Sequence, residues 1–154
     1  MGQTPGSPDT APLRIRPAQL GDASDVAALL DQLGYPCTRE EAAERISRVL
    51  HDPRSNLLLG ELEGKVCGLV SMDTRYSITR GADLARITAL VVTPDSARQG
   101  IGRQLLREIE TVARQARAVR LEVTSNLRRE GAHQFYLDCG YTEGSRHFIK
   151  LLGD

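Results

Sequence analysis

The sequence is poor in several residue types that mark particular classes of protein. It has no tryptophan, aromatic residues make up 4% of its 154 residues, and its 20 basic and 20 acidic residues cancel. A balanced charge gives no electrostatic footprint for nucleic acid or for an anionic membrane. No apolar run approaches the roughly 20 residues of a membrane-spanning helix. We therefore expect neither a nucleic-acid partner nor a membrane partner.

Cysteine and histidine are also scarce. The three cysteines, Cys37, Cys67 and Cys139, are odd in number and lack metal-ligand spacing, and the three histidines do not pair at helical ligand spacing. No basic start followed by an apolar stretch resembles a secretory signal. These features predict a reduced, cytoplasmic protein with no structural or catalytic metal.

Length and composition predict a disordered tail followed by one domain. Residues 1–11 contain glycine, proline, serine and threonine with little apolar material, which is typical of a mobile tail. The chain is 40% hydrophobic and 26% charged, as globular proteins are. We therefore expect residues 12–154 to form a single domain with one core.

The hydrophobic pattern predicts a mixture of strands and helices. Predicted strands cover residues 13–16, 56–62, 66–72, 85–92, 119–123 and 148–152. Predicted helices cover residues 20–33, 38–50, 101–116 and 128–139, and residues 73–82 are read as a loop or strand end. Because the two types mix without strict alternation, we expect an α/β protein with a central mixed, twisted sheet and helices on both faces.

The segment that says most about function is residues 90–106, which reads LVVTPDSARQGIGRQLL. A strand-like run ends at Pro94, and a polar loop with two glycines then opens an amphipathic helix. The first N–H groups of a helix lack intrahelical partners and carry partial positive charge, so they attract anions. Glycines let a phosphate approach the backbone. With the charge of Arg98 and Arg103, this segment predicts a phosphorylated cofactor at residues 98–103.

Two common phosphate-binding motifs do not fit this segment. The chain has no Gly-x-x-x-x-Gly-Lys-Ser/Thr run, and the dinucleotide fingerprint needs a third glycine where Leu105 stands. The segment instead resembles the acetyl-CoA-binding motif of the GNAT family of N-acetyltransferases, Gln/Arg-x-x-Gly-x-Gly/Ala. Gly100 and Gly102 match that motif, whereas Ala97 replaces its first residue. An ordinary loop with a glycine turn is the alternative interpretation.

A second segment is similar to the same family. Residues 121–141 read LEVTSNLRREGAHQFYLDCGY, which resembles the family's next strand, its asparagine and its Ala-x-x-Phe-Tyr-x-x-x-Gly-Tyr/Phe helix. Together with the opening LRIRPA of residues 13–18, the resemblance covers about residues 12–152 and implies the GNAT-like acyl-CoA N-acyltransferase fold. The ending CGYTEGSRHFIK of residues 139–150 is similar to the aminoglycoside N-acetyltransferase branch.

The resemblance implies an acetyl-CoA cleft between two splayed strands, here about residues 87–92 and 119–125. Backbone groups of Leu90, Val91 and Val92 would bind the pantetheine arm, and the N–H of Val91 or Val92 would polarise the thioester carbonyl. Asn126 would hydrogen-bond a pantetheine amide, although asparagine is also a favoured helix cap. The residues implied at the pyrophosphate are Ala97, Arg98, Gln99, Gly100, Ile101, Gly102 and Arg103.

The implied reaction is direct acetyl transfer to a primary amine in a ternary complex, which needs proximity and proton handling but no enzyme nucleophile. Tyr136 occupies the family's tyrosine position and would contact the cofactor and protonate the departing thiolate. It also lies at helical spacing with Ala132, Phe135 and Cys139, so a core position is the alternative.

The general base stays open, because the strand before the phosphate loop has no glutamate. Asp73, Asp83, Glu122 and Thr88 are candidates, as is a water relayed through backbone carbonyls. The leading hypothesis for the acceptor is a small-molecule amine. A lysine or N-terminal amine of a protein, and a non-catalytic acetyl-CoA-sensing module, are the alternatives. The resemblance also implies a possible homodimer.

Overall fold

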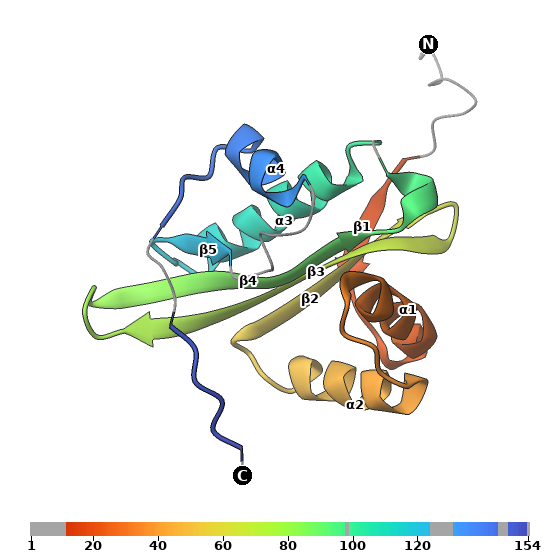
Figure 1. Cartoon of the computed structure of the whole chain (residues 1–154), viewed down its shortest axis with the longest axis horizontal. Helices are drawn as coiled ribbons and strands as arrows, with labels where there is room; N and C mark the ends of the chain where they lie inside the picture. The colour runs from red at the N-terminus through yellow and green to blue at the C-terminus, as the bar shows by residue number, and fades with distance from the viewer. Residues whose placement is uncertain (1–11, 98, 124–130, 145–147, 154) are drawn as a thin grey trace.

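The computed structural model describes residues 12–97, 99–123, 131–144 and 148–153 (Figure 1). The predictions for the tail at residues 1–11, for Arg98 and for Asn126 lie outside these residues. Within them, five strands form one sheet in the order β1-β2-β3-β4-β5. The strands are β1 (Arg14–Pro17), β2 (Ser55–Leu62), β3 (Lys65–Ser77), β4 (Ala82–Val92) and β5 (Leu121–Val123). The first four strands pair antiparallel and β5 runs parallel to β4, so the predicted mixed sheet is confirmed.

Helices lie on both faces of this sheet, as predicted (Figure 1). One face carries α1 (Ala23–Leu33) and α2 (Arg39–Leu50), and the other carries α3 (Ile101–Gln115) and α4 (Ala132–Asp138). Short 3-10 turns at Leu20–Asp22 and Pro94–Ser96 precede α1 and α3. A capping box begins α2, since the Glu41 N–H donates to Thr38 Oγ1 at 3.0 Å and the Thr38 N–H donates to Glu41 Oε1 at 2.8 Å.

Two predicted elements differ from the structure. Residues 73–82 were expected to be a loop or a strand end; residues 73–77 continue β3 and β4 begins at Ala82, because the hairpin stays paired out to Ser77 and Ala82. The strand predicted at 148–152 is wrong. Those residues form no strand, and Phe148, Ile149 and Leu151 are 85–99% exposed. An apolar run alone predicts a strand, but a strand also needs a neighbour with free backbone groups, and here none is paired to it.

The core has two parts, one on each face of the sheet. Beneath α3 it includes Ile87 and Leu105, and beneath α1 and α2 it includes Leu69 and Val91. The face on which β4 buries its side chains changes at Thr88, because Ser71 pairs with Ala89 whereas Met72 pairs with Ile87. Thr88 is therefore the extra residue of a β-bulge. Residues 85 and 87 face α3, while residues 89 and 91 face α1 and α2.

Candidate cofactor cleft and acceptor face

Among the described residues the parallel pairing of β4 with β5 is short, and it leaves the later part of one edge of β4 without a strand partner. The three paired positions are Ala85↔Leu121, Arg86↔Glu122 and Ile87↔Val123. Beyond Ile87, β4 continues to Val92 and stays paired with β3, but no further residue of β4 pairs with β5 among the described residues. The opening coincides with the bulge at Thr88. The family resemblance implied splayed strands over about residues 87–92 and 119–125, but Leu121–Val123 pair with β4, and residues 124 and 125 lie outside the described residues.

Hydrogen bonds at the end of β4 show which backbone groups face the open edge. The Thr93 N–H donates to the Cys67 carbonyl of β3 at 2.8 Å, whereas the Val92 carbonyl accepts from Gln32 Nε2 of α1 at 2.7 Å. Successive residues of a strand direct their backbone groups to opposite sides. The N–H groups of Leu90 and Val92 therefore face away from β3, and that of Val91 faces β3. Of the two donors that the sequence left open, this geometry favours Val92 over Val91.

The start of α3 has the features of an anion site. Gly100 precedes the helix with φ +76°, a left-handed conformation that favours glycine, and no side chain caps the first turn. That turn contains no acidic residue, while Arg103 is exposed. Ala97 and Gln99 are exposed beside it, and the buried Ile101 can offer its backbone alone. Free N–H groups without a neighbouring carboxylate suit a pyrophosphate.

Gly102 brings the phosphate loop, α4 and the open edge of β4 together. A Cβ atom at Gly102 would lie 3.5 Å from the Phe135 ring and 3.8 Å from Val92 Cγ2. The predicted loop and the end of β4 are therefore adjacent. Gln32 was missed by the sequence reasoning, since nothing in the spacing of α1 shows that its amide reaches β4.

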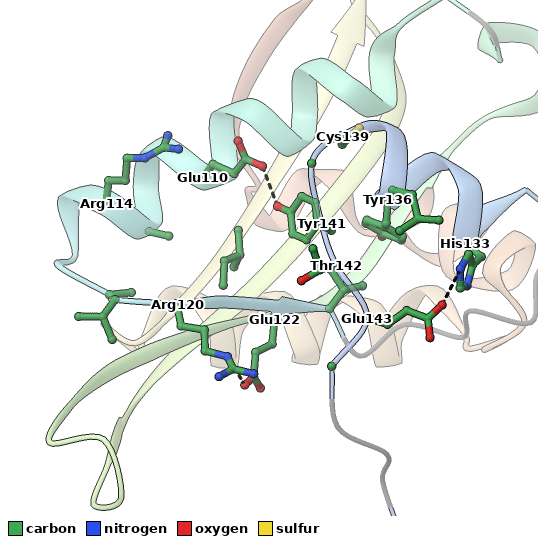
Figure 2. Close-up of a pocket in the computed structure, with 18 of the residues that line it drawn as sticks. Glu110, Arg114, Arg120, Glu122, His133, Tyr136, Cys139, Tyr141, Thr142 and Glu143 are labelled. Atoms are coloured by element: carbon green, nitrogen blue, oxygen red, sulfur yellow. Dashed lines mark hydrogen bonds and ion pairs between the residues drawn. The ribbon is translucent and has the colours of Figure 1, made fainter.

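Tyr136 is 7% exposed and belongs to the core beneath α3. Its ring makes edge-to-face contacts with Phe135, at 5.2 Å between centroids, and with Tyr141, at 5.6 Å. The Tyr141 hydroxyl donates to Glu110 Oε2 at 2.7 Å, and burial together with this carboxylate raises the pKa of Tyr141 (Figure 2). The position of Tyr136 therefore agrees with the core interpretation, and the acid role stays a prediction.

A cavity of about 1020 Å³ lies between the end of α3, β5 and α4. Of the described residues that the sequence predicted for the cofactor site, Tyr136 lines it and those of the phosphate loop do not. Figure 2 shows Tyr141 and Glu110 on one side of β5 and the Arg120–Glu122 ion pair, 3.1 Å long, on the other. This cavity is thus distinct from the loop and open edge described above.

The candidate bases separate into two groups. Side-chain alternation places Ser71 and Asp73 of β3, with Arg86 and Glu122, on the face that carries α1 and α2. Thr88 Oγ1 lies 2.8 Å from Ser71 Oγ, next to the opening. Asp83 instead pairs with Tyr76 near the far end of the β3–β4 hairpin. The structure therefore brings Asp73, Glu122 and Thr88 toward the opening, but not Asp83.

Other reactive groups have structural partners or environments. Burial raises the pKa of the Cys139 thiol, which disfavours the thiolate that a covalent mechanism would need. His133 Nε2 lies 3.1 Å from Glu143 Oε1 on the surface (Figure 2). Among the described residues, no group of three or more metal-ligating side chains comes together, and no helix is long and apolar enough to cross a membrane.

Comparison with known proteins identifies the family. Residues 25–141 match the model of the Acetyltransferase (GNAT) family. The chain is 34% identical over 143 residues to an aminoalkylphosphonate N-acetyltransferase of Salmonella typhimurium, and the match covers 90% of each protein.

Solved structures agree in fold. A GNAT family acetyltransferase of Staphylococcus aureus has a TM-score of 0.78 at 23% identity, covering 93% of this chain and 100% of that one. An aminoglycoside N-acetyltransferase, AAC(6')-Iy, in complex with CoA has a TM-score of 0.83 at 13% identity, covering 95% and 98%. The family match and the curated relative, together with this fold, show that the chain belongs to the GNAT family and is an N-acetyltransferase.

Proposed function

We propose that this N-acetyltransferase binds acetyl-CoA along the open edge of β4 and transfers the acetyl group directly to a primary amine of a small molecule. The observation that carries the proposal is the adjacency of two features: the edge of β4 from Thr88 to Val92, which pairs with no strand among the described residues, and the start of α3 at Gly100, which no side chain caps. The edge offers backbone groups to the pantetheine amides, and the helix start offers N–H groups to the pyrophosphate. Acetyl-CoA is the cosubstrate of GNAT acetyltransferases.

In this proposal the outward N–H groups of Leu90 and Val92 face the pantetheine arm, and one of them stabilises the oxyanion that forms on the thioester carbonyl. Ala97 to Arg103 hold the pyrophosphate, mainly through backbone N–H groups, because Ala97 has no polar side chain. Asn126 would bind a pantetheine amide. No nucleophile on the enzyme is required, because the amine attacks the thioester carbon and CoA leaves as the thiolate.

Tyr136 is our candidate for the acid that protonates the departing thiolate. Substitution Tyr136→Phe keeps the ring that packs on Phe135 and Tyr141 and removes the hydroxyl. If the hydroxyl is the acid, turnover falls by about 10²- to 10⁴-fold while acetyl-CoA affinity is retained. An unchanged kcat would remove Tyr136 from the mechanism and leave it as a core residue.

The relative's name makes aminoalkylphosphonates the first acceptors to test. A lysine or N-terminal amine of a protein remains the second candidate, and a lysine-containing peptide in the same panel tests it. Acetyl-CoA binding without CoA release across a broad panel of amines would instead favour a sensing role.

The first experiment is a calorimetric titration of the protein with acetyl-CoA, with Gly100→Glu as the control variant. The glutamate places a negative charge at the helix start, so micromolar binding should be lost. Binding that survives this substitution would move the pyrophosphate away from α3. A wild-type protein that binds no acetyl-CoA would contradict the proposal.

We also propose a homodimer and a reducing, cytoplasmic location. The apolar residues near the end of the chain, Phe148 to Leu152, are exposed, which supports pairing with a second copy. The three cysteines are all free thiols, which suits a reducing compartment. Light scattering during gel filtration gives the mass in solution, and a monomeric mass at micromolar concentration would contradict the dimer.

A further inference from the structure

The face of the sheet beneath α1 and α2 has an apolar part and a charged part. The apolar cluster under the two helices includes Leu69 of β3 and Ala89 and Val91 of β4. On the other side of the bulge the same face carries the charged side chains of Asp73 on β3 and Arg86 on β4. The ion pair of Arg120 with Glu122 continues this charged part onto β5. The charged part of this face therefore lies next to the start of the open edge of β4.

A small pocket of about 150 Å³ lies in this charged part. Its lining includes two cations, Arg75 and Arg86, and two carboxylates, Asp73 and Glu122, drawn from three neighbouring strands. The lining carries no net charge but contains separate positive and negative groups. A zwitterion complements such a pocket better than a neutral amine does.

Arg86 is the unusual member of this pocket. Asp73 lies directly opposite it on β3 and Glu122 beside it on β5, yet neither carboxylate lies within ion-pair distance of its guanidinium. Glu122 pairs instead with Arg120 at 3.1 Å. The Arg86 Nε atom is buried and has no hydrogen-bond partner in the part of the chain that the structure describes. An unsatisfied buried donor is unfavourable, so an anion that hydrogen-bonds to this guanidinium would bind favourably.

The position of Arg86 suits one end of a short acceptor. It precedes Ile87, the last residue of β4 that pairs with β5, and it lies two residues before Thr88. A strand rises about 3.3 Å per residue, so the open edge begins about 7 Å from Arg86 along the strand. An acceptor held at Arg86 by one end therefore directs its other end toward the acetyl group.

We propose that Arg86 binds the anionic group of the acceptor, and that the preferred acceptor is a short amine that carries a phosphonate or a carboxylate. The inference rests on the proposed function. The planar guanidinium forms paired, charge-assisted hydrogen bonds with either group. Asp73, opposite Arg86 on β3, adds a negative charge that draws a zwitterionic acceptor rather than a simple anion into the pocket. A polycationic acceptor would place a positive charge against Arg86 and is disfavoured.

The test compares acceptors of similar length in an assay of CoA thiol release. 2-Aminoethylphosphonate and β-alanine carry anionic groups, and propylamine does not. Each is assayed with the wild-type protein, with Arg86→Met and with Arg48→Met, an exposed arginine of α2 whose loss changes the net charge equally. Acetyl-CoA affinity is measured for all three proteins by calorimetry.

We expect the wild-type protein to prefer an anionic amine over propylamine. Arg86→Met should lower kcat/KM for that amine by about 10- to 100-fold, because hydrogen bonds to a charged group are lost, and leave propylamine and acetyl-CoA unaffected. Arg48→Met should change none of these values. The more reactive of the two anionic amines identifies the group, phosphonate or carboxylate.

Two results would overturn the inference: a wild-type protein that acetylates propylamine as well as the anionic amines, or an Arg86→Met variant that loses activity equally for every acceptor. The comparison of acceptors with the wild-type protein needs no variant, so it tests the preference for an anionic amine even if Arg86→Met fails to fold. In that case Arg86→Lys, which keeps the positive charge, tests the role of the planar guanidinium. Failure of the wild-type protein to bind acetyl-CoA contradicts the proposed function instead, which separates the two hypotheses.

Discussion

Gly68 of β3 lies against both β4 and α3, and substitution by alanine should disturb all three elements. Gly68 pairs with Val92 at the end of the open edge. A Cβ atom there would lie 2.8 Å from Leu105 Cδ1 and 3.2 Å from the Val91 carbonyl oxygen. The first distance is shorter than side-chain packing allows, and Leu105 is 0% exposed, so it has no free space to enter.

The magnitude follows from these contacts. Overpacking a tight core by one methyl group costs about 1–3 kcal/mol, and Gly68→Ala should fall in the upper half of that range. Gly60 provides the matched control, because a Cβ there would lie 3.5 Å from Leu105 Cδ2 and 3.3 Å from Leu13 Cδ1. Those neighbours are side chains that can shift slightly. We expect Gly60→Ala to cost less than about 1 kcal/mol.

A double-mutant cycle makes the reasoning refutable. Leu105→Ala alone leaves a cavity and should cost about 2–5 kcal/mol. In the double variant, the new methyl group at Gly68 occupies part of the space that Leu105 vacates. The two losses should therefore fall short of additivity by about 1 kcal/mol or more, as measured by urea denaturation. Strict additivity, or equal losses for Gly68→Ala and Gly60→Ala, would show that the contact with Leu105 does not limit packing.

Three further predictions concern the stability of the fold and the open edge of β4. Asp22→Asn removes the carboxylate charge and at least one of the two 2.9 Å hydrogen bonds from Arg16, which keeps its contact with Glu61, and should cost about 1.5–3 kcal/mol in denaturation. These bonds lower the pKa of Asp22, so in the wild-type protein their stabilisation is complete above the ordinary pKa of about 3.9 and is lost as the pH falls. The variant should lack this part of the acid dependence, and an unchanged acid profile would contradict the assignment. Gln32→Ala frees the Val92 carbonyl and should weaken acetyl-CoA binding in calorimetry by up to about tenfold, one ordinary hydrogen bond; unchanged affinity would mean that the bond does not hold the edge. Gly100 has φ +76° and no atom within 4 Å of an added Cβ, so Gly100→Val should lose about 1–2 kcal/mol through backbone strain and Gly100→Asn clearly less; equal losses would argue against strain.

The sequence by itself determined the elements whose signals are local. The capping residues Thr38 and Glu41, the turn at Glu63 and Gly64, and the apolar stripe of α3 specify structure through neighbours a few residues away. The glycine pattern at Gly100 and Gly102 indicated the phosphate loop for the same reason. The hydrophobic pattern predicted the mixed sheet and the helices on both faces, and the resemblance carried by residues 90–106 and 121–141 predicted the family.

Tertiary structure decided what depends on contacts distant in sequence. The bulge at Thr88 reverses the alternation along β4, and periodicity alone does not show where an extra residue is accommodated. The strand predicted at the end of the chain did not form, because an apolar run cannot specify its own partner. The charged pocket around Arg86 joins three strands, with Asp73 and Glu122 lying 13 and 36 positions from Arg86 in the sequence, so no motif marks it. Local chemistry selects the elements, whereas the pairing of distant backbones selects which side chains meet.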